Sequence, residues 1–270
     1  MSTLPARQLA LHARPRRRVP RWARRLAGPV LLLAVWQLAS SVGWIGETTL
    51  APPSTVLTTG WDLLQSGELQ TNLWASTRRV MVGLTLGTAA GVSLALVAGL
   101  FRLGEDLIDG PVQMLRTLPV LALVPLFIVW FGIDETPKIA LIVFGTAFPI
   151  YLNTYAGIRD VDIRLVEAAT TLGMGRAALI RHVILPGAWT SFLVGLRYSL
   201  GIAWLVLVVS EQINATDGLG DMMTKAREFN RLDIIVLGLV LYAVLGLLSD
   251  LVVRGLERTT LSWRRSFSGT

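Results

Sequence analysis

Long apolar runs alternate with short polar segments along most of the chain. A helix needs about 20 mostly apolar residues to cross a lipid bilayer. Six runs approach or reach that length: residues 26–42, 80–100, 112–133, 139–158, 191–213 and 232–253. The pattern therefore predicts an all-α, polytopic membrane protein with six transmembrane helices.

The polar segments between the runs predict the connections. After the turn at Pro52-Pro53, residues 54–64 have the pattern of a short amphipathic helix. Residues 101–110 are interpreted as a short polar loop, and residues 134–138 as a tight turn. The segment 214–231, which contains a glycine-rich turn, joins the last two runs.

Glycines recur at a fixed spacing in the second run. Gly83, Gly87 and Gly91 are four residues apart and share one face of a helix. Small residues at this spacing allow two membrane helices to approach backbone to backbone. We expect the span 80–100 to pack closely against another helix along this face.

Prolines interrupt the third and fourth runs at Pro119, Pro125 and Pro149. A proline inside a helix removes a backbone donor and kinks the helix, which leaves carbonyl groups without partners. Lipid does not tolerate such groups, so we expect the third span to face protein or a water-filled cavity. All three prolines are therefore candidates for a path through the membrane.

Charged side chains are costly in a bilayer, so each one within a span is a functional candidate. Arg197 lies about two turns into the fifth run, and its guanidinium stays charged. It could stabilise an anion on its passage, or it could pair within the protein or reach the lipid headgroups. The sequence leaves these alternatives open. Arg79 lies at the outer mouth of the second run, where it could attract anions or belong to a salt-bridged surface. Glu211 ends the fifth run, where we expect an interfacial or structural role.

A polar island at residues 159–190 separates the fourth and fifth runs. A helix is predicted to start near Asp162, and Asp160 and Arg164 have the spacing of a favourable ion pair along it. Gly173 offers the left-handed residue that ends many helices, and Pro186 is expected to end the next helical segment. The island is therefore predicted to form a helix, a hinge and a second short helix.

Composition agrees with a membrane protein and limits its chemistry. Of the 270 residues, 53% are hydrophobic and 16% are charged, and the mean hydropathy is +0.57. The absence of cysteine excludes disulfides and thiolate metal sites, and the two histidines make an imidazole site improbable. The only lysines, Lys138 and Lys225, do not belong to a Gly-Lys-Ser/Thr phosphate-binding motif. We therefore expect no cofactor and no enzyme activity, with any ATP hydrolysis in a separate subunit.

Positive charge is distributed asymmetrically. Eight arginines between positions 7 and 25 precede the first run, where they set membrane orientation more simply than they bind nucleic acid. With both termini inside, the cytoplasmic segments hold 18 of the 25 basic residues, counting Arg102 and Arg116 around the second connection. The polar island 159–190 is then cytoplasmic as well.

The polar island resembles the coupling loop of the membrane subunits of ABC importers. Glu167-Ala168-Ala169 is followed after three residues by Gly173, and after nine more by Val183-Ile184-Leu185-Pro186. Val183 stands where that pattern usually has isoleucine. The resemblance implies contact with an ATPase subunit through these residues: Glu167, Ala168, Ala169, Gly173, Val183, Leu185 and Pro186.

Further segments resemble the permeases of aliphatic-sulfonate importers, a group shared with taurine and nitrate permeases. They include Trp130-Phe131-Gly132-Ile133, typical of the group, and Phe148-Pro149-Ile150-Tyr151, which favours sulfonates. The resemblance implies a type I ABC importer permease fold in the bacterial inner membrane and a homodimer. It also implies two copies of an ATP-binding subunit and a periplasmic binding protein that delivers alkanesulfonates as a sulfur source.

The predicted organisation is a basic cytoplasmic leader (1–25), a six-helix permease domain (26–258) with its coupling loop (159–190), and a cytoplasmic tail (259–270). Three alternatives remain. The cargo could be taurine, nitrate or another small anion. A secondary transporter is disfavoured because no inverted repeat is evident, and an intramembrane enzyme is disfavoured because no catalytic motif is present.

Overall fold

The computed structural model describes residues 21–46 and 49–261, and this part of the chain contains helices and turns but no β-strand. The helices are α1 (Arg21–Ser41), α2 (Pro53–Gln65), α3 (Glu68–Leu100), α4 (Arg102–Leu115), η1 (Val120–Leu123), α5 (Val124–Phe131), α6 (Glu135–Arg159), α7 (Ile163–Thr171), α8 (Arg176–Leu179), η2 (Ile180–Ile184), α9 (Leu185–Asn214), α10 (Leu219–Glu228) and α11 (Leu232–Thr260). Most of the leader and of the tail lies outside the described residues.

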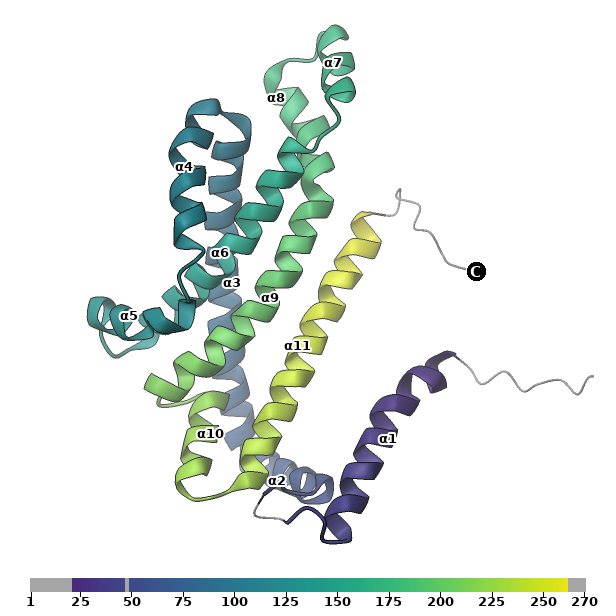
Figure 1. Cartoon of the computed structure of the whole chain (residues 1–270), viewed down its shortest axis with the longest axis vertical. Helices are drawn as coiled ribbons and strands as arrows, with labels where there is room; N and C mark the ends of the chain where they lie inside the picture. Colours follow the sequence, from purple (N-terminus) through teal and green to yellow (C-terminus); the bar gives the residue numbers. More distant parts are fainter. Residues whose placement is uncertain (1–20, 47–48, 262–270) are drawn as a thin grey trace, which may run out of the picture.

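The bundle is elongated, with short helices at both ends (Figure 1). The helices α7 and α8 form one end, and α2 and α10 lie at the opposite end (Figure 1). The first residues of α1 and the last residues of α11 both point toward the α7–α8 end (Figure 1). The predicted helix at 54–64 is confirmed as α2.

Four helices are long and apolar enough to cross a membrane: α3, α6, α9 together with α8 and η2, and α11. These confirm the second, fourth, fifth and sixth predicted spans. A fifth span exists if α4 and the η1–α5 segment, which meet at an angle of 86°, count as one. In α1 the apolar stretch Ala27–Ser41 is shorter, so the total of six spans stays a prediction.

The third span differs from its prediction. The predicted interruption near Pro119 is confirmed by the 86° bend between α4 and the η1–α5 segment, but the start at residue 112 is wrong. The polar loop at 101–110 is wrong as well, because α4 begins at Arg102 directly after α3. The acids in α4 occur at helical spacing and face α6: Glu105 accepts a hydrogen bond from Tyr155 (2.8 Å), and Asp109 accepts one from Tyr151 (3.1 Å). Tertiary partners therefore convert an apparent loop into a helix.

Because residues 102–115 form helix α4, Arg116 does not lie where the sequence analysis expects it. Only Phe101 separates α3 from α4, and Arg116 caps the opposite end of α4. The assignment of Arg116 to the second connection is therefore wrong. The predicted turn at 134–138 is also shorter than expected, since α6 starts at Glu135.

The centre of the bundle consists of α3, α6 and α9 packed side by side (Figure 1). The glycine face of α3 contacts α6. A Cβ atom on Gly91 would lie 2.6 Å from the carbonyl oxygen of Ala147, and one on Gly83 would lie 2.6 Å from Cγ2 of Ile142. Any side chain there would force the helices apart, which confirms close packing along this face.

Candidate functional site

The α7–α8 segment has the local geometry that its sequence predicts. The Asp162 side chain caps α7 by accepting a hydrogen bond from the backbone N–H of Arg164 at 2.9 Å. Gly173 follows the helix with a φ of +80°, and the N–H of Met174 bonds back to the carbonyl of Ala169 at 3.0 Å. The start near Asp162 and the left-handed turn at Gly173 are confirmed.

Two predictions for this segment are wrong. Asp160 caps the end of α6, while Arg164 lies in α7, so the two residues do not share a helix. Pro186 does not end a helix: α8 continues through the π-helical turn η2 into α9, and Arg176–Ile213 forms one long helix. The wider π turn and the position of Pro186 in the first turn of α9 accommodate its missing N–H.

The coupling residues predicted from the motif differ in exposure. Glu167 and Ala168 are exposed, whereas Ala169 is buried beneath them. Leu172, next to the left-handed glycine, is 86% exposed. The remaining motif residues are Gly173, which is exposed in the turn, and three on the continuing helix, with Val183 partly buried and Leu185 and Pro186 exposed. An exposed apolar surface beside an acidic side chain is suited to docking another protein.

Contacts attach this segment to the corner between α3 and α4. Arg176 donates a hydrogen bond to the carbonyl of Leu100 at 3.2 Å, and its guanidinium lies 4.9 Å from the centre of the Phe101 ring. The guanidinium interacts favourably with the C-terminal end of α3 through the helix dipole. It also makes a favourable cation–π interaction with the aromatic ring. Arg159 pairs with Glu105 of α4 at 3.4 Å. The α7–α8 segment therefore rests against the corner between α3 and α4.

Arg197 pairs within the protein, as one of the sequence-based alternatives proposes. It lies 2.7 Å from Glu257 and 3.1 Å from Asp250, both on α11. Asp250 also pairs with Arg254 at 2.6 Å. These ion pairs join α9 to α11 and balance the guanidinium with carboxylates.

The other candidates for the path lie elsewhere. Pro119 lies within the exposed break between α4 and η1, and Pro125 lies in the first turn of α5. Pro149 lies in α6, where its carbonyl oxygen would be 2.8 Å from a Cβ on Gly195 of α9. The structure therefore does not bring Arg197 and the three prolines into one site, and their part in a path stays a prediction.

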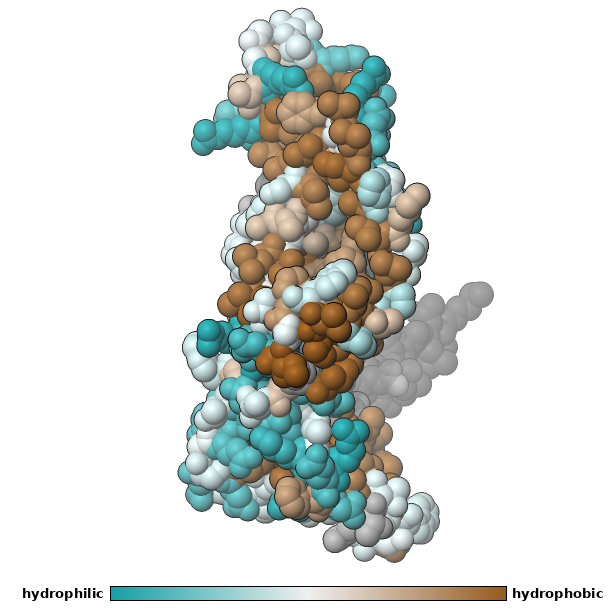
Figure 2. All heavy atoms as spheres, turned by 90° about the vertical axis from the view of Figure 1, so that its left-hand side faces the viewer, coloured by the Kyte–Doolittle hydropathy of each residue, from teal (hydrophilic) through white to brown (hydrophobic). Residues whose placement is uncertain are grey.

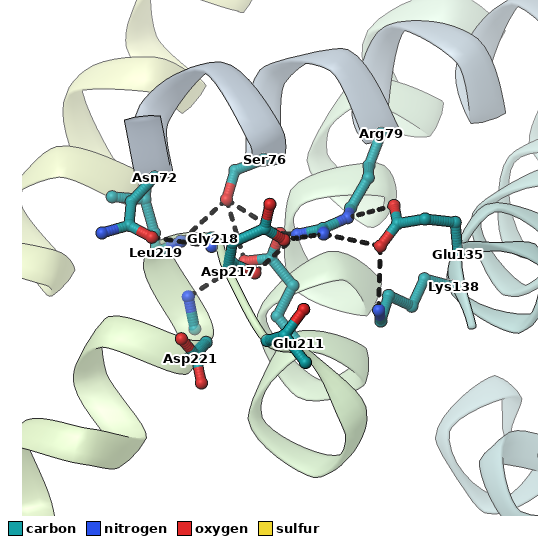
Figure 3. A network of polar contacts seen from close by, with 12 residues as sticks. Asn72, Ser76, Arg79, Glu135, Lys138, Glu211, Asp217, Gly218, Leu219 and Asp221 are labelled. Carbon is teal, nitrogen blue, oxygen red and sulfur yellow. Dashed lines mark hydrogen bonds and ion pairs between the residues drawn. The ribbon is translucent and has the colours of Figure 1, made fainter. Parts of the chain in front are cut away.

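At the opposite end, a buried ion cluster joins several helices (Figure 3). The guanidinium of Arg79 is 3% exposed and contacts three carboxylates. It lies 2.6 Å from Glu211 on α9 and 2.7 Å from Glu135 on α6, and it also pairs with Asp217 before α10. We call Arg79, Glu135, Glu211 and Asp217 the Arg79 cluster.

Neutral groups complete the cluster around Glu211. Its carboxylate, fully buried, accepts hydrogen bonds from Ser76 (2.8 Å), the N–H of Gly220 (2.9 Å) and the hydroxyl of Tyr242 (3.2 Å). Buried charges of this kind persist only when they are fully paired and hydrogen-bonded. The Arg79 cluster therefore fastens α3, α6, α9, α10 and α11 together at this end.

Sequence reasoning missed this cluster. It placed Arg79 at the mouth of one run, as an anion-attracting or salt-bridged surface residue, and Glu211 at the end of another, in an interfacial or structural role. The available signal was the cost of a charge at a span end, which calls for a partner of opposite sign. The partners are 132 residues apart in the chain, so only the packing of α3 against α9 identifies them.

Together these features define a helical membrane protein with an exposed α7–α8 segment at one end. The chain belongs to the family described as "binding-protein-dependent transport system inner membrane component", whose model matches residues 87–262. Two solved structures share the fold. An amino acid ABC transporter matches with a TM-score of 0.61 at 20% identity, covering 75% of this chain and 96% of that chain. The methionine ABC transporter MetNI matches with a TM-score of 0.56 at 17% identity, covering 71% and 97%.

Several curated relatives are more similar in sequence. The putative aliphatic sulfonates transport permease protein SsuC of Escherichia coli (strain K12) is 48% identical over 252 residues, which cover 92% of this chain and 96% of that protein. The SsuC protein of Bacillus subtilis (strain 168) is 42% identical, covering 96% and 94%. The taurine transport system permease protein TauC of Escherichia coli (strain K12) is 35% identical, covering 86% of each. The chain is thus a permease of the ABC transporter type.

Proposed function

We propose that this chain is the transmembrane permease subunit of an ATP-driven importer that carries aliphatic sulfonates into the cell. The observation that carries this proposal is the 48% identity, over nearly all of both chains, to a permease named for aliphatic sulfonates. Taurine is the second candidate cargo, because a taurine permease is 35% identical. Both cargoes share a sulfonate group on a short carbon chain.

The importer needs partners, because this chain has no phosphate-binding motif. We propose two ATP-binding subunits, a second copy of this chain and a periplasmic binding protein. The α7–α8 segment is the proposed contact with the ATPase. Its support is the exposed Glu167 and Leu172 beside the rigid turn at Gly173.

In this mechanism, ATP binding closes the ATPase pair and moves the α7–α8 segments with it. The motion reaches the bundle along α9, because Arg176–Ile213 is one unbroken helix that ends beside the Arg79 cluster. The two copies then open their shared cavity toward the binding protein, and hydrolysis returns them to the inward-open state. The bistable element is the pair of bundles.

The α7–α8 end is proposed to face the cytoplasm, with both termini on the same side. The arginine-rich leader supports this orientation through the positive-inside rule. The Arg79 cluster and α10 then lie at the outer end, where the binding protein would dock.

Growth on a single sulfur source tests the cargo. A bacterial strain that lacks its own sulfonate and taurine importers receives this chain with its ATPase and binding protein. We expect growth on ethanesulfonate and slower growth on taurine. Growth on taurine but not on ethanesulfonate would reassign the cargo, and growth on neither would refute sulfonate import. Sulfate serves as the control for general fitness.

A further inference from the structure

Arg116 lies half way along the membrane-spanning part of the bundle. Helix α4 runs antiparallel to α6, as two contacts show: Glu105 meets Tyr155 near one end, and Asp109 meets Tyr151 one turn further on. Continuing the same register brings Arg116 to the middle of α6. The 14 residues of α4 also place it about 20 Å from the corner where α3 ends.

The neighbouring break confirms this depth. Val120, in η1, would lie 3.6 Å from a Cβ on Gly145, which is close to the centre of α6. Residues Thr117, Leu118 and Pro119 between α4 and η1 are exposed and follow no regular helix. Irregular backbone at membrane depth occurs only where protein or a water-filled cavity covers it. The face at the break is therefore not a lipid-facing surface.

The side chain of Arg116 is exposed, and no carboxylate of the described residues forms an ion pair with it. Its neighbours Met114, Leu115 and Leu118 are exposed apolar side chains. The face that carries α4 and α5 is largely hydrophobic away from its two ends (Figure 2). Arg116 is thus a single fixed positive charge in mostly apolar surroundings.

Such a charge must meet water or an anion. A guanidinium does not lose its proton in a protein. By the register of α4 against α6, Arg116 is level with about residue 144 of α6, so about 20 Å of helix separates it from the α3–α4 corner and about 14 Å from the start of α6. The contrast with Arg79 and Arg197 is direct, since carboxylates of the same chain neutralise both of them.

We propose that Arg116 lines the translocation cavity and binds the sulfonate group of the cargo as it crosses the membrane. This inference rests on the proposed function and deepens it. The planar fork of the guanidinium can donate two parallel hydrogen bonds to a tetrahedral oxyanion, and the attraction is strong in a site with little water. Arg116 is then a residue that selects anions within the permease itself.

Transport by the complete importer tests the proposal. The chain, its ATPase and its binding protein are reconstituted in liposomes, and uptake of radiolabelled ethanesulfonate is measured together with ATPase activity. Loss of the charge in Arg116→Gln should reduce uptake about ten-fold, whereas Arg116→Lys should stay within about three-fold of the wild type. ATPase stimulation by the loaded binding protein should persist in both variants, as a structural defect would abolish it.

Two outcomes of this experiment overturn the inference. One is wild-type uptake by Arg116→Gln. The other is loss of assembly in Arg116→Gln with normal assembly in Arg116→Lys, which would assign Arg116 to an ion pair with an acid of the second copy. If the wild-type importer takes up no ethanesulfonate at all, the proposed function fails instead.

Thiol labelling gives an independent readout, since the chain contains no cysteine. Arg116→Cys in the reconstituted importer is treated with 2-sulfonatoethyl methanethiosulfonate, an anionic reagent that needs a thiolate in water. The matched control is Leu247→Cys, an exposed position near the middle of α11. We expect rapid labelling only at position 116. Equal labelling rates at the two positions would contradict the proposal.

Discussion

The two ends of the bundle treat polar residues in opposite ways. At the α7–α8 end, Glu167 and the apolar Leu172 are exposed, and the order comes from local features such as the Asp162 cap and Gly173. At the α2–α10 end, the charges of Arg79 and Glu211 are buried and shared among five helices. One end exposes its polar and apolar side chains, as the proposed contact with an ATPase requires, and the other end holds the helices in register.

The comparison suggests a division of labour. A segment that is stabilised by local backbone and capping interactions can move as a unit with a partner without disturbing the core. A buried ion pair tolerates the loss of one partner poorly, because the other charge is then left buried without compensation. Substitutions in the Arg79 cluster should therefore destabilise the folded protein. Substitutions at the α7–α8 end should instead uncouple ATP hydrolysis from transport.

The largest expected effect follows from Arg79→Met. This change leaves the fully buried Glu211 carboxylate with neutral donors only. We expect the free energy of unfolding to fall by about 3–5 kcal/mol. Thermal and denaturant unfolding of the purified permease in detergent measure this change.

Two further variants sharpen the result. The neighbouring Arg78 is exposed, so Arg78→Met should change stability by less than about 0.5 kcal/mol. In the double variant Arg79→Met/Glu211→Gln both charges are absent, so much of the stability should return. Equal stability of Arg78→Met and Arg79→Met would show that the Arg79 cluster does not hold this end together.

An intermediate effect is expected from Gly173→Val. A β-branched residue at a φ of +80° is strained, at a cost of about 1–2 kcal/mol, and the strain distorts the turn after α7. We expect the permease to insert and assemble but uptake of cargo to be lost, with ATPase activity no longer coupled to transport. Uptake and ATPase activity of the reconstituted importer measure the two effects separately.

The matched control for this variant is Gly175→Val. Gly175 has a φ of −68°, and no neighbouring atom lies within 4 Å of the position that a Cβ would take, so valine fits there without strain. Normal uptake with both valine variants would argue against a rigid turn as the coupling element.

The smallest effect on stability is expected from Glu167→Lys. The side chain is exposed, so the free energy of unfolding should change by less than about 0.5 kcal/mol. Reversal of the charge on the docking surface should nevertheless reduce co-purification of the ATPase subunit. The same reversal at the opposite end, Glu228→Lys, should leave co-purification intact. Retention of the ATPase by Glu167→Lys would place the contact elsewhere.

Much of this protein could be predicted from its sequence because the rules involved are local. Hydropathy alone places α3, α6, α9 and α11, since lipid accepts few alternatives to an apolar helix. The spacing of Gly83, Gly87 and Gly91 indicates a close helix contact. The cap at Asp162 and the left-handed turn at Gly173 depend on residues within a few positions of each other.

Only the tertiary structure decided the rest, because it depends on contacts between distant segments. Tyr151 and Tyr155 stabilise the charged start of α4 as a helix. A π turn allows the helix to continue from α8 into α9 past Pro186. The partnership of Arg79 with Glu211, and the position of Arg116 at the far end of α4 instead of in a loop, follow from how the spans pack together. Local sequence determines most of the helices, while packing decides which distant charges are paired.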